Sequence, residues 1–357
     1  METWQFMIAA TVLAAILNQW LIPIAWRLDL VDKPSARKTH NGNVPLVGGI
    51  SVFITTILVY LLAFNFSENL GCFIISSALM VLIGVIDDRF DLSVSVRIIG
   101  QLLIASIIVF GSGTYISYLG DLFGLGAIEL GVWGLPFTLL AIMAAMNAYN
   151  MVDGIDGLLG LLSAIAFFGI VLLGVTHGQS FTVNAALVIT CALIPFLMRN
   201  TGFPIKRSRK IFMGDAGSMF IGLAIVWLLA LLTSPSHIND TGVAVRPVAV
   251  LWLIAVPLMD MVAIMVRRLV KGQSPFKPDR NHLHHIFLNA GAEPKHALGI
   301  IGIYALSLLA LGLFLEWLAV AEFIVLLIYV VVFGVYCFTL RNIGYTLRMW
   351  DILTRNR

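Results

Sequence analysis

The sequence has few charged residues and few cysteines. Asp, Glu, Lys and Arg make up only 11% of its 357 residues, against about 25% in an ordinary soluble domain. A water-soluble protein of this size could not bury the 60% of residues that are hydrophobic. Three cysteines exclude a disulfide-stapled secreted module, and a net charge of +3 is too small to indicate nucleic-acid binding. The solvent of this chain is therefore largely lipid.

Stretches without charge recur along the whole chain, at the length of about 20 residues that a helix needs to cross a bilayer. The longest, Gly157–Met198, is long enough for two crossings. The pattern predicts an all-α polytopic membrane protein with about eleven transmembrane helices, at residues 5–26, 47–65, 70–86, 95–111, 133–150, 158–176, 183–198, 216–233, 247–266, 297–315 and 323–340. Residues 1–340 then form a single integral-membrane domain, followed by a basic tail at 341–357.

The basic residues are divided unequally between the two sets of loops that these spans define. Twenty-one of the 22 Lys and Arg residues fall on one side, and only Arg246 falls on the other. By the positive-inside rule, the N-terminus is periplasmic and the C-terminal tail is cytoplasmic. All three cysteines lie within predicted spans, so a Cys-type metal site is not indicated.

Four clusters of polar residues are predicted on the same cytoplasmic side. They are Asp87 with Asp88, Asn147 to Gly157, Lys210 to Ser218 around Asp215, and Ser274 to His285. Ionisable groups beside apolar helices are costly unless paired, and they commonly mark function. Carboxylates with an Asn carbonyl form an all-oxygen donor set that suits Mg²⁺ or Mn²⁺.

Each cluster alone also has a structural interpretation. A pair of aspartates at a helix end more often caps that helix, and a His-rich segment can be a polar loop. Gly157 and Gly217 lie where spans begin, and helix N-termini bind phosphate. Arg97, ten residues after Asp87, could reach the same place. Asp260, inside the ninth span, either pairs with Arg267 or Arg268 or lines the site.

Together and in this order, the motifs resemble those of the polyprenyl-phosphate N-acetylhexosamine-1-phosphate transferases. The resemblance covers roughly residues 5–340. Its motifs are Asp87-Asp88, Asn147-x-x-Asn150-x-x-Asp153-Gly-x-Asp156-Gly157, Phe212-Met-Gly-Asp215-x-Gly-Ser218 and the cluster from His282 to His285. The run Arg280-Asn-His282-Leu-His284-His285 is similar to the branch that uses UDP-GlcNAc. In the phospho-MurNAc-pentapeptide translocases, three consecutive histidines follow a Pro and an apolar residue.

The resemblance implies transfer of GlcNAc-1-phosphate from UDP-GlcNAc to undecaprenyl phosphate, with UMP as the leaving group. The reaction would occur on the cytoplasmic face of the bacterial inner membrane and would initiate a lipid-linked surface glycan. Catalysis would come mostly from positioning and charge neutralisation. The resemblance places the Mg²⁺ (or Mn²⁺) on Asp215 and Asn150. Asp87 and Asp88 would bind the lipid phosphate or the metal, and one of them can act as a base.

The resemblance assigns the other site residues to the donor. Asp153 and Asp156, which are also candidates for a catalytic role, would organise the nucleotide, with Asp156 accepting a hydrogen bond from uracil and Phe212 stacking on the ring. His282, also in a catalytic role, would hold the diphosphate or the sugar. The remaining substrate-binding candidates are Asn147, Arg97, Lys33, Arg280, His284 and His285.

Two alternatives remain open at this point. A phospho-MurNAc-pentapeptide translocase shares most of the motifs. An ion-coupled transporter also uses intramembrane carboxylates, but it places them near the bilayer midplane. The sequence leaves open whether the protein forms a homodimer.

Overall fold

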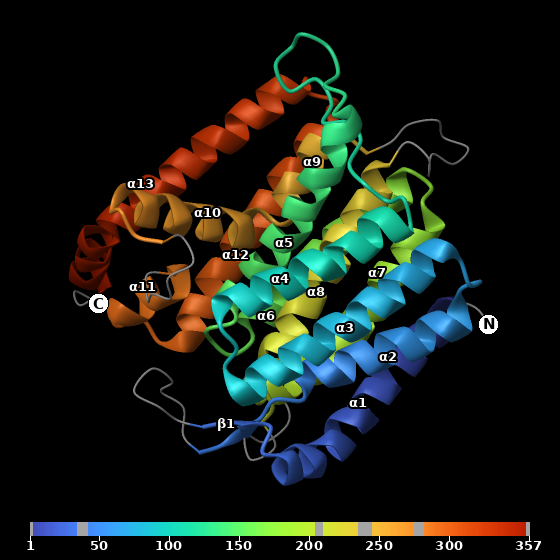
Figure 1. The fold of residues 1–357 in the computed structure, drawn as a ribbon. Helices are drawn as coiled ribbons and strands as arrows, with labels where there is room; N and C mark the ends of the chain where they lie inside the picture. Colours follow the sequence, from blue (N-terminus) through green and yellow to red (C-terminus); the bar gives the residue numbers. More distant parts are fainter. Residues whose placement is uncertain (1–2, 34–41, 204–209, 235–244, 275–281, 355–357) are drawn as a thin grey trace.

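The chain folds into a bundle of helices, as the sequence predicts (Figure 1). The computed structural model describes residues 3–33, 42–203, 210–234, 245–274 and 282–354, with side chains as far as residue 342. Its elements are α1 Thr3–Leu28, β1 Val31–Asp32, β2 Val44–Pro45, α2 Gly48–Ala63, α3 Glu68–Phe90, α4 Val94–Ser106, η1 Ile107–Gly111, η2 Gly131–Trp133, α5 Gly134–Val152, α6 Leu158–Thr176, α7 Ser180–Thr201, α8 Gly214–Thr233, α9 Pro247–Leu253, α10 Ala255–Val270, α11 Leu283–Asn289, α12 Pro294–Trp317 and α13 Glu322–Thr354.

Nine helices in the described part of the chain are long and apolar enough to cross a membrane. They coincide with nine of the predicted spans. A tenth crossing is obtained if the bent pair α9 and α10 counts as one span. The predicted span at 47–65 corresponds to α2, which is apolar but has only 16 residues.

The predicted span at 247–266 is not one straight helix. The axes of α9 and α10 are 86° apart, with the break at Ile254 (Figure 1). Pro257 explains the break, because its ring would clash with the carbonyl of Leu253 in a continuous helix and it has no N–H to donate. In the first turn of α10 the missing N–H needs no partner, so Pro257 is tolerated there.

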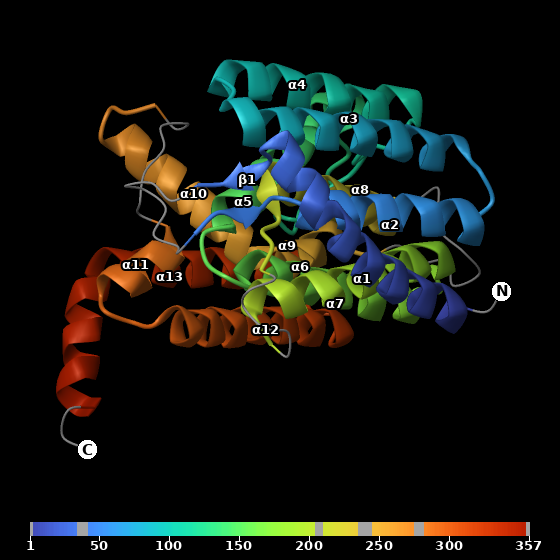
Figure 2. The ribbon, with the colours of Figure 1, turned by 90° about the horizontal axis from the view of Figure 1, so that it is seen from below.

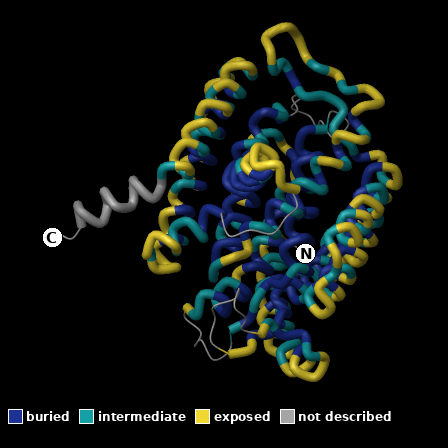
Figure 3. The backbone as a smooth tube through the Cα atoms, turned by 60° about the vertical axis from the view of Figure 1, so that its left-hand side comes forward, coloured by how far each residue is buried: buried dark blue, intermediate teal, exposed yellow. Residues whose placement is uncertain are grey.

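The helix α8 forms the centre of the bundle. All residues of its 18-residue apolar segment are buried, whereas only 17% of the corresponding segment of α1 is buried. Figure 2 shows α4 and α12 at opposite edges, and Figure 3 shows the exposed residues on the outer helices around a buried interior. Trp227 of α8 stacks on Phe73 of α3 with ring centroids 4.0 Å apart. The exposed apolar side chains of the outer helices form the surface that meets lipid.

Small residues bring α2 and α3 very close to the start of α8. A Cβ on Gly49 would overlap the backbone of Gly217, and a Cβ on Gly84 would overlap the backbone of Ala216. Close backbone approach through small residues is a common means of packing membrane helices. Gly217, which the sequence suggests as a phosphate position, therefore serves the crossing of α2 and α8.

Backbone hydrogen bonds join the segments that precede α2 and α8. The strands β1 and β2 form a two-stranded antiparallel sheet. Phe212 donates its N–H to the carbonyl of Pro45 (2.9 Å) and accepts the N–H of Gly48 (2.9 Å). The connection between α1 and α2 is thereby fixed to the N-terminus of α8, at the same end of the bundle as the C-terminus of α3.

Candidate active site

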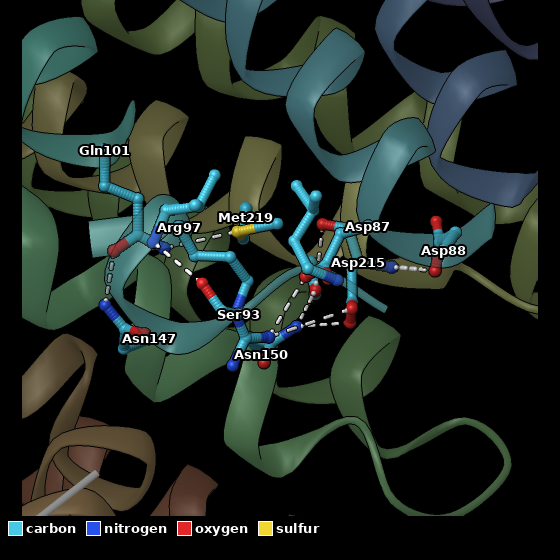
Figure 4. Close-up of polar contacts among 12 residues, drawn as sticks. Asp87, Asp88, Ser93, Arg97, Gln101, Asn147, Asn150, Asp215 and Met219 are labelled. Atoms are coloured by element: carbon cyan, nitrogen blue, oxygen red, sulfur yellow. Dashed lines mark hydrogen bonds and ion pairs between the residues drawn. The ribbon is translucent and has the colours of Figure 1, made fainter. Parts of the chain in front are cut away.

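Carboxylates from two helices meet at this end of the bundle (Figure 4). Asp87 lies in the last turn of α3 and is 5% exposed. Its Oδ1 accepts the N–H of Leu92 (2.8 Å), and its Oδ2 accepts a hydrogen bond from Nη1 of Arg97 (3.1 Å). The same Nη1 lies 4.0 Å from Oδ2 of Asp215, in the first turn of α8. Arg97 therefore reaches Asp87, as its spacing predicts, and partly neutralises both carboxylates.

Asp88 caps the neighbouring helix α8. Its carboxylate accepts the backbone N–H groups of Asp215 (2.8 Å) and Ala216 (3.3 Å). These N–H groups have no partner within the helix, and the positive end of the helix dipole favours an anion beside them. Gly214 has φ +74° and lies against the same carboxylate, so a side chain would not fit there. Asp88 thus fixes the position of Asp215 relative to α3.

Asn150, at the end of α5, contacts Asp215 directly. Its Nδ2 donates to Oδ1 of Asp215 (2.6 Å) and to Oγ of Ser218 (3.0 Å). The structure thus brings together the two residues expected to hold the metal ion.

Asn147 lies one turn deeper in α5 and belongs to a separate network. Its Nδ2 donates to Oε1 of Gln101 (2.8 Å) and to the carbonyl of Met143 (2.7 Å). Gln101 in turn donates to Sδ of Met219 on α8 (3.3 Å). These contacts join α4, α5 and α8 beside the carboxylates (Figure 4).

The protein donors near Asp215 are few. Among the described residues, no group of three or more His, Cys, Asp or Glu side chains is arranged to hold a metal ion. Mg²⁺ takes only one or two protein carboxylates and completes its shell with water and substrate phosphates. The Asp215 carboxylate and the Asn150 carbonyl are oxygen donors of this kind, and the small set fits such an ion.

Asp153 adds a further carboxyl from the turn between α5 and α6. The residue as a whole is exposed, although its carboxyl lies among protein atoms that displace much of its water. This desolvation, followed by the charges of Asp215, Asp156 and Asp32, raises the pKa of Asp153 from 3.8 to about 7. The Asp153 carboxyl is therefore only partly ionised near neutral pH when no cation is present.

Lys210 joins two residues that the sequence analysis assigns to the nucleotide. Its Nζ lies 2.7 Å from Oδ2 of Asp156 and 4.7 Å from the centre of the Phe212 ring. No sequence motif marks Lys210 as a site residue. It stands in a loop with several other basic residues, and nothing in the composition distinguishes it from them.

Asn200 is a second residue near the site that the sequence analysis does not identify. Its Oδ1 accepts the N–H of Gly157 (2.6 Å), and its Nδ2 donates to the carbonyl of Ile211 (3.0 Å). It is 6% exposed and fixes the turn before α6 to the segment before α8. The N–H of Gly157, which the sequence suggests for phosphate, is thus bonded to Asn200.

The histidine cluster is fixed to the membrane helix α10 through Asp260. Oδ2 of Asp260 lies 2.8 Å from Nδ1 of His282, the residue that precedes α11. Oδ1 accepts the N–H of Leu283 (3.0 Å) and the hydroxyl of Tyr336 on α13 (2.9 Å). The partners that the structure gives Asp260 are thus His282, Leu283 and Tyr336, where the sequence suggests Arg267 or Arg268 or a place in the lining of the site.

His284 lies between His282 and the turn that carries Asp153. Its ring is parallel to that of His282, with centroids 5.8 Å apart, and the His285 ring lies 4.2 Å away. A Cβ on Gly154 would overlap the His284 ring. Burial, with smaller effects of His285 and His282, lowers the pKa of His284 to about 3, so this ring is neutral at physiological pH.

One substrate-binding candidate, Lys33, lies apart from these groups. Lys33 is exposed and pairs with Asp29 (2.9 Å), which also contacts Arg89. Arg280 lies outside the described residues. The described part of the site therefore consists of the carboxylate group around Asp215 and the histidine group at Asp260, connected by the turn at Asp153.

Comparison with known proteins shows that the chain is similar to transferases. The sequence profile of glycosyl transferase family 4 matches residues 70–233. A relative from Salmonella typhi, 40% identical over 89% of this chain and 86% of its own length, is named undecaprenyl-phosphate alpha-N-acetylglucosaminyl 1-phosphate transferase. Relatives with the same name are 39% identical in Pasteurella multocida (94% of this chain, 92% of the relative) and in Escherichia coli K12 (89% and 86%).

Proposed function

The chain belongs to the family of undecaprenyl-phosphate N-acetylglucosaminyl 1-phosphate transferases, and from this premise we propose how it works. It transfers GlcNAc-1-phosphate from UDP-GlcNAc to undecaprenyl phosphate. An oxygen of the lipid phosphate attacks the phosphorus that carries the sugar, and UMP leaves. The product is undecaprenyl-pyrophosphate-GlcNAc.

The observation that carries this proposal is the convergence of three helix ends around Asp215. Asn150 of α5 donates a hydrogen bond to the Asp215 carboxylate, and Asp88 of α3 accepts the Asp215 backbone N–H. Asp87 of α3 is linked to Asp215 through Arg97, which lies near both carboxylates. Phosphoryl transfer requires anions to be brought together and their charge neutralised. A cation-binding carboxylate group beside an arginine performs both tasks.

A divalent cation supports this chemistry in the proposal. Asp215 and Asn150 would hold Mg²⁺ or Mn²⁺, which would neutralise charge on the diphosphate. Asp88 fixes Asp215, and Arg97 is available to a phosphate oxygen as well as to Asp87. Asp87, through its pairing with Arg97, orders the place where the lipid phosphate would bind.

The nucleotide sugar would bind between Asp156 and the histidines. Lys210 contacts both Asp156 and the ring of Phe212 and so holds them near each other. A carboxylate near an aromatic ring suits recognition of a planar, polar base. His282 would contact the diphosphate or the sugar. This arrangement supports UDP-GlcNAc as the donor, together with the run from Arg280 to His285.

The proposal includes eleven crossings and a cytoplasmic site. With α2 as one crossing and the bent pair α9 and α10 as another, the termini lie on opposite sides of the membrane. The basic residues then place the C-terminus and the active site in the cytoplasm. A soluble nucleotide sugar can meet a membrane-held phosphate at this boundary of the bacterial inner membrane.

Release of UMP by the purified full-length protein tests the function. The protein receives undecaprenyl phosphate with UDP-GlcNAc or UDP-MurNAc-pentapeptide, in the presence of Mg²⁺, Mn²⁺ or EDTA. We expect UMP from UDP-GlcNAc only, loss with EDTA, and recovery with the metal. Asp215→Asn should lose more than about 99% of the rate, since a metal ligand is removed. Asp121→Asn, on the loop at the opposite end, is the control. No UMP from either donor would refute the transferase, and release only from the second donor would favour the translocase.

The alternative of an ion-coupled transporter does not fit the surroundings of the acidic residue inside the spans. Asp260 is the acidic group farthest inside a predicted span at this end, and it is 1% exposed. His282, Leu283 and Tyr336 occupy both of its oxygens. A carboxylate with these fixed partners suits support of a site better than the binding and release of an ion.

A further inference from the structure

A buried carboxylate connects three separate parts of the chain beside the proposed active site. Asp260 belongs to α10, His282 precedes α11, and Tyr336 belongs to α13 (Figure 1). Asp260 is 1% exposed, His282 is 7% exposed and Tyr336 is 5% exposed. The three contacts to Asp260 measure 2.8, 3.0 and 2.9 Å. A buried carboxyl group whose two oxygens both take part in hydrogen bonds fixes its partners firmly.

The hydrogen-bond pattern at Asp260 determines which nitrogen of His282 carries a proton. The backbone N–H of Leu283 can only donate, and it shares Oδ1 with the Tyr336 hydroxyl. Oδ2 faces Nδ1 of His282. An ionised carboxylate only accepts hydrogen bonds, so Nδ1 must be the donor. Nε2 is then the ring nitrogen of His282 that remains for another partner.

The ring of His284 lies beside that of His282, on the side toward the site. The two rings are parallel, with an interplanar angle of 6°. His284 is 2% exposed and lies against Gly154 of the turn between Asp153 and Asp156. Asp260, His282, His284 and Gly154 thus form a continuous series of contacts from a membrane helix to the carboxylates of the site.

The bend before α10 places Asp260 in this series. Pro257 breaks the helix, and α10 leaves the axis of α9 at 86°. Asp260 lies nearly two turns after the break at Ile254, on α10, the part of the pair that packs against α5 and α13. A straight helix through these residues would direct α10 elsewhere and would separate Asp260 from His282.

We propose that Asp260 is a positioning residue for the transfer reaction, which holds His282 as the Nδ1–H tautomer and leaves Nε2 to the phosphate or sugar of the donor. This inference rests on the proposed function, because that function makes the nucleotide sugar the molecule that His282 contacts. Asp260 itself contacts no substrate. Its effect on the rate passes through the tautomer and the orientation of the imidazole ring.

Replacing Asp260 by Asn tests the inference without removing the side chain. The amide can donate to Nδ1 and thereby favour the opposite tautomer. We expect Asp260→Asn to lower kcat by about 10- to 100-fold, as is typical when the partner of a functional histidine is lost. Tyr336→Phe is the matched control. It removes one hydrogen bond from the same carboxylate and should leave kcat within about threefold.

The tautomer itself is the second readout, and it does not depend on activity. ¹⁵N-histidine NMR of the full-length protein in nanodiscs distinguishes protonated from unprotonated ring nitrogens, and the spectrum of His282→Gln assigns the signals. We expect Nδ1–H in the wild type and in Tyr336→Phe, and Nε2–H in Asp260→Asn. A wild-type His282 with unprotonated Nδ1 would overturn the inference even if Asp260→Asn fails to fold. Equal losses of kcat in the two variants would also overturn it. A wild type that releases no UMP would instead refute the proposed function.

Discussion

At the scale of single residues, two roles can be distinguished for Asp87. It can act as a base, or it can order Arg97 and the proposed binding site of the lipid phosphate. A phosphate monoester has a second pKa of about 6 and is mostly dianionic at neutral pH, so little proton transfer is needed. We therefore expect Asp87→Asn to lose at least about 90% of the rate of UMP release at every pH from 6.5 to 9. The measurement is the pH profile of the variant beside that of the wild type. Recovery of the variant at high pH would support the base instead.

Asp153 gives the metal-free protein a pH-dependent stability. Its pKa is raised from 3.8 to about 7, so between these values the folded state holds a proton that the unfolded chain has lost. The stabilisation is complete below pH 3.8 and disappears as the pH rises to about 7. In EDTA, the melting temperature of the wild type should therefore fall more between pH 5 and 7.5 than that of Asp153→Asn. Parallel curves for the two proteins would contradict the raised pKa.

The sequence predicts residues with distinctive motifs better than residues with ordinary ones. Asp87, Asn150 and Asp215 lie in motifs, and the structure brings them together. Asn200 and Lys210 also contact the site, but an Asn at a helix end and a Lys in a basic loop occur in any membrane protein. Only the folded chain places their side chains between two site segments.

At the scale of elements, the crossing of α2 and α8 depends on glycine. A methyl group at Gly49 would overlap the backbone of Gly217, so the helices must separate. We expect Gly49→Ala to lower the free energy of unfolding by about 1–3 kcal/mol, as overpacking does, and to reduce UMP release by displacing Asp215. Gly299→Ala in α12 is the control, since nothing lies within 4 Å of the added carbon. Denaturation in detergent measures both, and equal stability of the two variants would contradict the crossing.

The sequence locates the helices well but does not show their bends. Ten of the predicted spans coincide with an apolar helix or with its principal part, because charge-free length is a local property. The exception is 247–266, which becomes α9 and α10. Pro257 is visible in the sequence, but a proline inside an apolar run can kink a helix slightly or redirect it completely. The packing of α10 against α5 and α13 decides which of these occurs.

At the scale of the whole molecule, the proposed orientation can be tested with one cysteine at each end. Leu125, on the loop between α4 and α5, is 91% exposed, and Lys271 is exposed just after α10. In a variant without the three native cysteines, a membrane-impermeant maleimide should label Leu125→Cys in intact cells with a permeabilised outer membrane. Lys271→Cys should react only after the inner membrane is opened. The reverse pattern would invert the topology.

The burial of α8 shields the reaction centre from the mechanics of the bilayer. A membrane that thickens or thins acts on helices through their lipid-facing surfaces, by tilting or bending them. The apolar segment of α8 is entirely buried and has no surface that faces lipid. Forces from the bilayer therefore reach Asp215 only through the helices packed around α8. The outer helices can tilt with the membrane while α8, and Asp215 with it, keeps its position. We therefore expect the geometry at Asp215 to change little between bilayers of different lipid composition.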